Sequence, residues 1–250
     1  MKFIKFISMH LIIDVGNTRV KAALFKDDTI VELVVFDKKR IISEVRKIIK
    51  NNTVKIGIIS SVSSISSKKL LKLKTLTDFL VVSSSTKVPF KNLYKTPKTL
   101  GVDRVALVVS AVNTYKNNNV LIIDAGTCIT YDFVNEKSEY LGGAISPGIQ
   151  MRFQSLHNYT SKLPLLVKKM VNSFTGKNTN ESINSGVVNG VIKEVDGVIL
   201  DYKEKYVNLT VVLTGGDTNF LAKQLKSSIF ANQNFLLEGL NKLLIFNQDK

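Results

Sequence analysis

Two short turns that combine aspartate with glycine have the composition of phosphate-binding sites. The first lies in IIDVGNTRVKAALF, where Asp14 ends an apolar run and Gly16 follows it. A glycine lets the backbone approach a ligand closely, and backbone N–H groups with the Asn17 and Thr18 side chains can donate to phosphate oxygens. Lys21 adds a positive charge, and Asp14 is suited to hold a hydrated cation that bridges phosphates. The alternative is an ordinary hairpin turn with polar residues.

The same design recurs later in the chain. Asp124-Ala125-Gly126-Thr127 lies within VLIIDAGTCITYDFV, and IIDAGTC superposes on IIDVGNT about 110 positions earlier. Internal repetition of this kind indicates a duplicated architecture. Two such turns at the ends of paired buried strands could converge on one nucleotide.

A third glycine turn closes the apolar run VVLTGG. It reads Thr214-Gly215-Gly216-Asp217 and precedes a segment with helical character. Its glycines could approach an adenosine or a ribose closely. Alternatively, the turn only caps the helix that Asp217 begins.

Apolar periodicity predicts an α/β protein. Ile41, Val45 and Ile48 have the spacing of one helical face, whereas the neighbouring apolar runs have the length of strands. In the first half we expect strands at about 10–14, 19–26, 29–36, 55–62 and 79–83, helices at 39–50, 66–76 and 101–116, and a loop over 86–100.

The tract KNNN at 116–119 is the expected boundary between two halves, 1–117 and 118–250. After it we expect two strands within 120–134, further strands at 138–148 and 209–216, and helices near 147–157, 181–205, 217–226 and 235–245. A meander of three strands followed by helices and strands is therefore expected twice, in halves that face each other across a cleft.

The bulk composition is that of a globular protein. The chain has 250 residues, of which 44% are apolar and 22% charged. Cys128 is the single cysteine, so no intrachain disulfide is possible, and we expect a reducing, cytoplasmic compartment. No run approaches the roughly 18 apolar residues of a membrane span, so we expect no membrane partner.

The chain begins MKFIKFISMHLIID, in which lysines precede an apolar run as they do in signal peptides. There is no small-residue cleavage site, however, and the apolar part runs straight into the Asp14 turn, which cleavage would destroy. We therefore expect residues 1–8 to be a dispensable extension or a misassigned start before Met9.

The net charge of +15, from 35 Lys and Arg against 20 Asp and Glu, allows two interpretations. A basic surface could bind nucleic acid, or it could attract anionic ligands by long-range steering. The lysines are scattered along the polar sides of helical periods, as in KKRIISEVRKIIK. We interpret them as a solvated basic surface and do not expect nucleic acid as a partner.

The motifs and their order resemble those of type III pantothenate kinases, a family within the actin, sugar kinase and Hsp70 superfamily. The similarity extends over nearly the whole chain from about residue 11. It rests on DVGNTRVK (14–21), LGVDR (100–104), DAGTCIT (124–130), GGAISPGIQ (142–150), TSKLP (160–164), NTNESINSG (178–186) and TGGD (214–217).

This resemblance implies duplicated ribonuclease H-like domains of the actin-like ATPase type, each a mixed sheet flanked by helices, with ATP in the cleft between them. It also implies transfer of the ATP γ-phosphoryl group to the primary hydroxyl of pantothenate, the first step of coenzyme A biosynthesis. Such a transfer has a loose transition state, so the protein mainly aligns the hydroxyl, neutralises the phosphates and excludes water. A carboxylate near the hydroxyl is sufficient as the base.

By the same resemblance Asp103 is the general base, in the first turn of a helix whose dipole favours the ionised carboxylate. Arg104 would hold the pantothenate carboxylate through a two-pronged hydrogen bond. The implied substrate-binding residues are Tyr94, Gly101, Val102, Asp103, Arg104 and Thr179. The alternatives are structural: a helix-terminal acid for Asp103, a surface ion pair for Arg104, a loop aromatic for Tyr94 and a helix N-cap for Thr179.

The resemblance assigns ATP binding to residues 14–21 and to Thr127. The first set comprises Asp14, Val15, Gly16, Asn17, Thr18, Arg19, Val20 and Lys21. Strand alternation places Arg19 on the face opposite Thr18, so we expect Arg19 to face solvent.

Asp124 matches an aspartate that binds a monovalent cation, K⁺ or NH₄⁺, and Mg²⁺ is expected with ATP near Asp14. We expect Cys128 to be a small buried residue and neither His10 nor His157 to be a ligand.

The family also implies a homodimer whose interface contributes to the pantothenate pocket. Two other functions share part of the pattern. A sugar kinase, acetate kinase or exopolyphosphatase of the same superfamily would share Asp14, Asp124 and Gly215-Gly216, but it would not need GVDR, TSKLP and NTNESI together. A non-enzymatic accessory factor in transcription would suit the positive charge, but it would not need Asp103.

Overall fold

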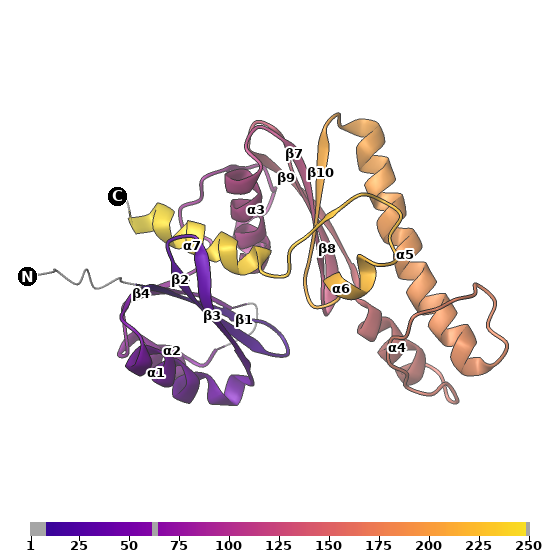
Figure 1. The fold of residues 1–250 in the computed structure, drawn as a ribbon, viewed down its shortest axis with the longest axis horizontal. Helices are drawn as coiled ribbons and strands as arrows, with labels where there is room; N and C mark the ends of the chain where they lie inside the picture. Colours follow the sequence, from indigo (N-terminus) through magenta and orange to yellow (C-terminus); the bar gives the residue numbers. More distant parts are fainter. Residues whose placement is uncertain (1–8, 62–64, 249–250) are drawn as a thin grey trace, which may run out of the picture. The chain divides into compact units, whose positions relative to one another are not determined.

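The computed structural model describes residues 9–61 and 65–248 (Figure 1). The expected extension, residues 1–8, therefore lies outside the described residues, as does Val62 at the end of one predicted strand. The chain forms two compact units. Unit 1 contains the described residues up to Thr114 together with those from Phe235 onward, and unit 2 is Tyr115–Asn234. The compact units thus differ from the expected halves, 1–117 and 118–250, chiefly because the last helix belongs to unit 1. The domain boundaries at 117 and 118 stay a prediction.

Unit 1 is built on a mixed five-stranded sheet. Its strands are β1 (Met9–Val15), β2 (Val20–Lys26), β3 (Thr29–Phe36), β4 (Val54–Ser61) and β5 (Phe79–Val81), in the order β3-β2-β1-β4-β5. The first three form an antiparallel meander, whereas β4 runs parallel to β1 and β5 parallel to β4. The carboxyl ends of β1 and β4, where Asp14 lies, are therefore side by side.

Helices α1 (Ile41–Asn51) and α2 (Ser67–Lys74) pack on one face of this sheet. Their buried residues, among them Val45 and Leu73, share a core with Leu11 and Ile13 of β1. The apolar spacing of α1 predicts this packing, because residues three and four apart lie on one side of a helix. Ile12 and Asp14 alternate with these core residues and so point to the opposite face of the sheet.

Helices α3 (Val102–Thr114) and α7 (Phe235–Gln248) pack against one another and contact β4, and α7 also contacts β1 (Figure 1). Asn241 of α7 is buried; its Oδ1 accepts a hydrogen bond from His10 Nδ1 at 2.9 Å, and its Nδ2 donates to the Asp27 carbonyl at 2.8 Å. Helix α7 is thereby fixed to β1 and to the turn between β2 and β3.

Unit 2 repeats the order of unit 1. Strands β7 (Asn119–Ala125), β8 (Cys128–Val134) and β9 (Glu139–Pro147) form the antiparallel meander, β10 (Leu209–Thr214) runs parallel to β7, and β11 (Phe230–Ala231) runs parallel to β10. The order β11-β10-β7-β8-β9 matches β5-β4-β1-β2-β3 strand for strand. This confirms the expected α/β class with duplicated ribonuclease H-like domains.

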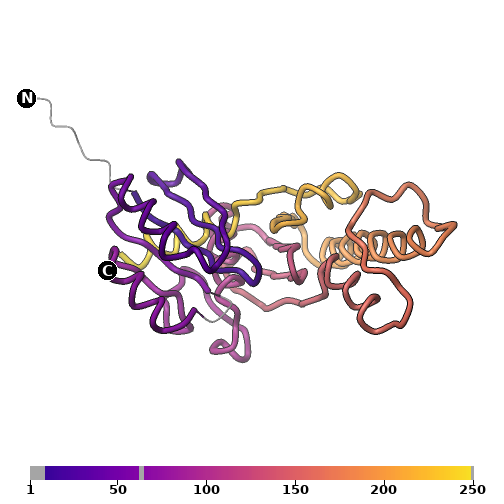
Figure 2. Tube along the Cα trace, turned by 90° about the horizontal axis from the view of Figure 1, so that it is seen from below, coloured from indigo at the N-terminus to yellow at the C-terminus, as the bar shows by residue number. Residues whose placement is uncertain are grey.

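The helices of unit 2 are α4 (Ile149–Asn158), α5 (Thr179–Lys205) and the short α6 (Thr218–Leu221). Buried Val187, Val191 and Val195 place α5 on the sheet, in a core shared with Phe133 of β8. Residues 159–178 connect α4 to α5 without regular structure and can be followed in Figure 2. Within the described residues, no helix is both long and apolar enough to cross a membrane.

Most expected elements are present within a few residues of their predicted ends. The loop 86–100 contains only the two-residue β6 (Lys91–Asn92) and a 3₁₀ turn at Pro97–Thr99, and another 3₁₀ turn, Lys38–Arg40, precedes α1. The helix predicted at 217–226 was wrong in length, because α6 ends at Leu221. Further along, the chain is held by the Asp196 carboxylate of α5, which accepts hydrogen bonds from the backbone N–H groups of Lys226 and Ser227.

Candidate active site

The first aspartate turn joins β1 to β2. Asp14 is the penultimate residue of β1 and lies in register with Lys21 of β2 and Ser60 of β4. The Gly16 N–H closes the turn on the Arg19 carbonyl at 3.1 Å. This geometry presents a carboxylate, a lysine and turn N–H groups at the end of the sheet.

The side chains of Asn17, Thr18 and Arg19 are all exposed in this turn, whereas Val15 and Val20 are buried in the core. The two valines can therefore offer a ligand only their backbone. The argument from strand alternation for Arg19 was wrong in its premise, because Arg19 lies in the turn and β2 begins at Val20. Arg19 is exposed like Asn17 and Thr18, so exposure alone does not decide which of the three side chains would contact a nucleotide.

The second aspartate turn has the same position in unit 2. Asp124 is the penultimate residue of β7 and lies in register with Thr130 of β8 and Thr214 of β10. The Gly126 N–H donates to the Cys128 carbonyl at 2.9 Å, and this turn is one residue shorter than the first. Thr127 is exposed at its tip, and the Gly148 N–H donates to the Thr127 carbonyl at 3.1 Å.

The third glycine turn is folded against the second. Gly215 has φ +95°, a conformation that favours glycine, and a Cβ there would overlap Asp124 Oδ1 and the Ala125 carbonyl oxygen. The Asp217 N–H also donates to the Ala125 carbonyl at 2.9 Å. Asp217 occupies the N-cap position of α6, but its side chain makes no capping bond and instead forms an ion pair with Lys168. Unit 2 thus gathers Asp124 and Gly215 at one place.

The start of α3 gathers the predicted substrate residues of unit 1. Asp103 is in the first turn, and its Oδ1 accepts the Arg104 backbone N–H at 2.8 Å. The Arg104 guanidinium lies 5.6 Å from the centroid of the Tyr94 ring. A Cβ at Gly101 would overlap Asp103 Oδ1, so a side chain there would displace the Asp103 carboxylate from its present position. Val102 begins α3 and is half-buried.

Arg104 is only 5% exposed, so its interpretation as a surface ion-pairing residue was wrong. A buried guanidinium beside an aromatic ring and next to a carboxylate is suited to bind a planar anion such as a carboxylate. Tyr94 lies in the loop 86–100, which brings its ring to Arg104 in the first turn of α3.

Thr179 lies elsewhere, in unit 2. It is the first residue of α5 and lines a pocket of about 700 Å³ with Arg152, Leu163 and Ile183. The N-cap alternative for Thr179 was wrong, because the cap is Asn178, whose side chain accepts the Glu181 N–H at 3.0 Å. The structure leaves Thr179 exposed and available to a ligand or a partner.

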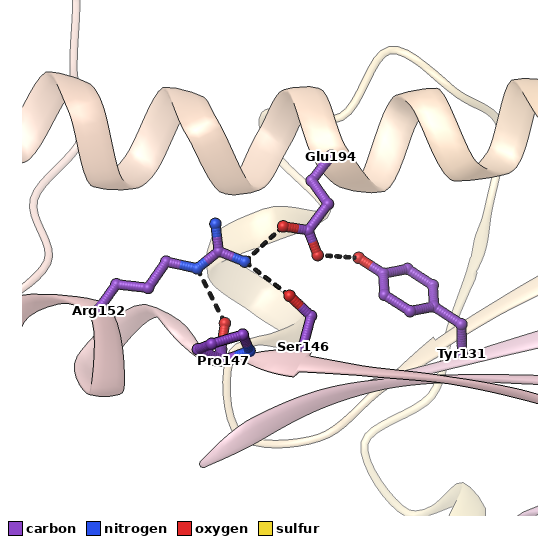
Figure 3. A network of polar contacts seen from close by, with 5 residues as sticks. All are labelled: Tyr131, Ser146, Pro147, Arg152 and Glu194. Carbon is purple, nitrogen blue, oxygen red and sulfur yellow. Dashed lines mark hydrogen bonds and ion pairs between the residues drawn. The ribbon is translucent and has the colours of Figure 1, made fainter. Parts of the chain in front are cut away.

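A polar network beside this pocket was not predicted (Figure 3). Glu194 of α5 accepts a hydrogen bond from Tyr131 at 2.9 Å and from Arg152 at 2.5 Å, and Arg152 also donates to the Pro147 carbonyl and to Ser146 at 2.9 Å. It ties β8, β9, α4 and α5 together. Ser146 and Pro147 belong to the motif GGAISPGIQ, but nothing in the sequence links them to Tyr131 of β8 or Glu194 of α5, which are far away along the chain.

The electrostatics of this network favour an ionised Glu194. Burial on its own would raise the pKa of Glu194, but hydrogen bonds from Arg152, Ser146 and Tyr131 bring the pKa below its usual value. Burial, together with the bond to Glu194, raises the pKa of Tyr131 strongly, so its hydroxyl stays protonated. The network is therefore a carboxylate held between a guanidinium and a neutral phenol.

Within the parts of the chain that the structure describes, no three His, Cys, Asp or Glu side chains gather as a metal cluster. A cation at Asp14 or Asp124 would thus need backbone, hydroxyl, phosphate or water oxygens besides the carboxylate, which is usual for Mg²⁺. Neither histidine has a free Nδ1: that of His10 is hydrogen-bonded to the Asn241 side chain, and that of His157 to the Leu163 carbonyl. Cys128 is partly exposed, so its expected burial was wrong.

Solved structures with this fold include kinases. The chain is similar, with a TM-score of 0.64 and 20% identity, to a structure described as a conserved putative Baf family transcriptional activator from Campylobacter jejuni, covering 96% of this chain and 100% of that one. A putative N-acetylmannosamine kinase from Listeria monocytogenes has a TM-score of 0.56 at 11% identity, covering 96% and 99%. At such identities these likenesses show the fold alone. The repeated strand order and the paired aspartate turns define a protein with the duplicated ribonuclease H-like fold.

Sequence comparison is more specific. The sequence model described as type III pantothenate kinase matches residues 10–201. A type III pantothenate kinase of Flavobacterium psychrophilum is 48% identical over 236 residues, 94% of this chain and 98% of the relative. That of Christiangramia forsetii is 49% identical over 241 residues, 96% and 99%. The chain belongs to the type III pantothenate kinase family.

Proposed function

We propose that the chain transfers the γ-phosphoryl group of ATP to pantothenate, giving 4′-phosphopantothenate and ADP, the first step of coenzyme A biosynthesis. The observation that carries the proposal is the cluster of Tyr94, Asp103 and Arg104 at the start of α3, in a chain of this family. A carboxylate next to a buried guanidinium offers a base for the hydroxyl and a partner for the carboxylate of pantothenate.

In this proposal Asp103 is the general base. Its position in the first turn of α3 favours the ionised form through the helix dipole, and the bond from the Arg104 N–H orients the carboxylate. Arg104 binds the pantothenate carboxylate, and Tyr94, Gly101, Val102 and Thr179 complete the substrate site. Alignment of the hydroxyl with the γ-phosphorus is the main task, because the transition state is loose.

The two aspartate turns bind ATP in this proposal. Residues 14–21 supply turn N–H groups, Asn17, Thr18 and Lys21 to the phosphates, and Thr127 contributes from the second turn. Asp14 fits a hydrated Mg²⁺, which neutralises phosphate charge when it is bound with ATP.

We propose that Asp124 holds a monovalent cation, K⁺ or NH₄⁺. The support is its place beside Gly215, where a Cβ would meet both Asp124 Oδ1 and the Ala125 carbonyl oxygen, so the glycine leaves room next to two oxygens that could bind a cation. If this is correct, K⁺ raises the turnover of the parent enzyme but not that of Asp124→Asn. Equal activation of both proteins by K⁺ would contradict it.

Asp103→Asn tests the proposed base. The substitution preserves size but removes the basic oxygen, and we expect pantothenate-dependent ADP release to fall by about 10²-fold or more, the contribution typical of general base catalysis. Asp201→Asn, at an exposed position on α5, is the matched control and should keep the parent rate. A near-native rate for Asp103→Asn, with melting temperatures equal to the parent, would exclude Asp103 as the base.

We further propose a homodimer in the cytoplasm. Gly186 and Gly190 leave open space on α5, and exposed Leu165, Val167 and Phe174 lie in the segment before that helix, so this surface can accept a second copy. A monomer mass in analytical ultracentrifugation at assay concentration would contradict the dimer. Recovery of the native protein from a membrane or secreted fraction would contradict the location.

A further inference from the structure

Ser60 of β4 is a buried hydroxyl without an evident structural purpose. Its exposed fraction is 0%, and within the described part of the chain its Oγ has no hydrogen-bond partner. Burying a hydroxyl without a partner destabilises the folded state. Such a group in a native protein calls for an explanation, and the position of Ser60 in the sheet supplies one.

The sheet places Ser60 next to the first aspartate turn. Ser60 is in register with Asp14, which in turn is in register with Lys21, so the three side chains lie in one row on the same face of the sheet. Neighbouring strands are about 4.8 Å apart, a spacing at which a serine hydroxyl can reach an adjacent carboxylate by rotating about χ1. Asp14 is only half-buried, so its carboxylate can meet both Ser60 and a ligand.

Unit 2 has a comparable arrangement. Thr130 is in register with Asp124, and its Oγ1 is buried and likewise has no partner within the described residues. Each aspartate turn therefore has a buried hydroxyl in its row. Thr130 is not the counterpart of Ser60, however, because β8 corresponds to β2 and β10 corresponds to β4. The counterpart of Ser60 is Thr214 of β10, which is also in register with its aspartate, Asp124, and is only 1% exposed. In both units, a buried hydroxyl residue thus lies beside the aspartate on the matching strand, which argues for a role linked to the turns.

We propose that Ser60 is a positioning residue for Asp14: with nucleotide and Mg²⁺ bound, its hydroxyl donates to the Asp14 carboxylate and fixes the orientation that accepts metal-bound water. The inference rests on the proposed binding of Mg²⁺-nucleotide at residues 14–21. It assigns a role to a residue outside the turn itself. The hydroxyl makes its bond only in the complex, so it stabilises the complex and not the free protein.

Ser60→Ala in the full chain tests this inference, with Ser110→Ala as the matched control. Ser110 lies in α3 of the same unit and is also buried with an Oγ that has no partner in the described residues. Calorimetric titration with ADP, with Mg²⁺ and with EDTA, measures the affinities, and thermal unfolding without nucleotide measures stability. The full chain is used throughout.

We expect Ser60→Ala to weaken binding of Mg²⁺-ADP about tenfold, the effect of losing a hydrogen bond to a charged group worth about 1.4 kcal/mol. Binding in EDTA should be unchanged, and Ser110→Ala should bind as the parent does. Both variants should melt at or above the parent temperature, because each loses a buried hydroxyl without a partner. If Ser60→Ala does not fold, Ser60→Cys, which keeps a side chain of similar shape with a weak donor, takes its place.

Parent affinity of Ser60→Ala for Mg²⁺-ADP would overturn the inference, as would an equal loss of ADP affinity in EDTA. These outcomes are distinct from a failure of the proposed function. If the parent chain does not bind Mg²⁺-ADP at all, the proposed ATP site is contradicted. If the parent and Ser60→Ala bind Mg²⁺-ADP equally well, only the role of Ser60 is contradicted.

Discussion

At the scale of single residues, the site combines side chains that a motif reveals with others that only the fold brings together. Asp14 and Asp124 could be predicted because the same turn occurs twice. Arg104 was predicted as a ligand residue, but its burial beside Tyr94 depends on how the loop 86–100 folds back. Glu194, Arg152 and Tyr131 could not be predicted at all, since they come from three different elements.

Glu194→Gln tests the network of Figure 3. The pKa of Glu194 is lowered in the folded state, so its ionised form stabilises the fold at neutral pH. This contribution is present above the pKa of Glu194 in the unfolded chain and is lost as the pH falls through the lower folded pKa. We expect the variant to lose about 1–3 kcal/mol at pH 7.

The measurement is urea denaturation over a range of pH. The difference between parent and Glu194→Gln should shrink as the solution is made acidic enough to protonate Glu194. Glu204→Gln, on the exposed side of the same helix, is the control and should match the parent throughout. A difference that stays constant down to strongly acidic pH would contradict the role of charge in the network.

At the scale of elements, α7 supports the helix that carries Asp103. Gly239 of α7 lies against α3, where a Cβ would overlap the Ala106 carbonyl oxygen and meet the Ser110 side chain. Ala106 lies three residues beyond Asp103 and two beyond Arg104 in α3. Close contact at Gly239 thus determines where the first turn of α3 lies relative to the sheet, and Asn241 fixes α7 in turn to β1 and to the turn after β2.

Gly239→Ala should separate α7 from α3. We expect a loss of about 1–3 kcal/mol in unfolding free energy, the usual cost of overpacking. We also expect a larger fall in kcat than rise in KM for ATP, because Asp103 moves with α3. Gly197→Ala, where a Cβ meets nothing, is the control and should be slightly stabilising. Unchanged stability and kcat in Gly239→Ala would show that the helix contact tolerates a methyl group.

At the scale of the whole molecule, the repeated strand order is the feature that the sequence predicts best. Alternating apolar runs and the recurring IID turn specify the two meanders, because buried strands and tight turns leave strong local signals. The two-residue β11 was missed because Phe230 and Ala231 are exposed and show no alternation. The assignment of α7 to unit 1 depends on long-range packing, which local sequence does not encode.

The net charge of +15 is also a property of the whole molecule. ATP and pantothenate are both anions, so a basic surface is suited to attract them. The Campylobacter structure described as a transcriptional activator shows only a shared fold at 20% identity. Family membership and an intact Asp103 instead support the kinase.

The most direct test of the central proposal follows the phosphoryl group itself. The full chain is incubated with Mg²⁺ and ATP labelled in the γ-phosphate, with and without pantothenate, and the products are separated by chromatography. We predict that the label appears in 4′-phosphopantothenate in a one-to-one ratio to ADP, and that Asp103→Asn forms almost none. Label released only as inorganic phosphate, or ADP formation that ignores pantothenate, would contradict the account.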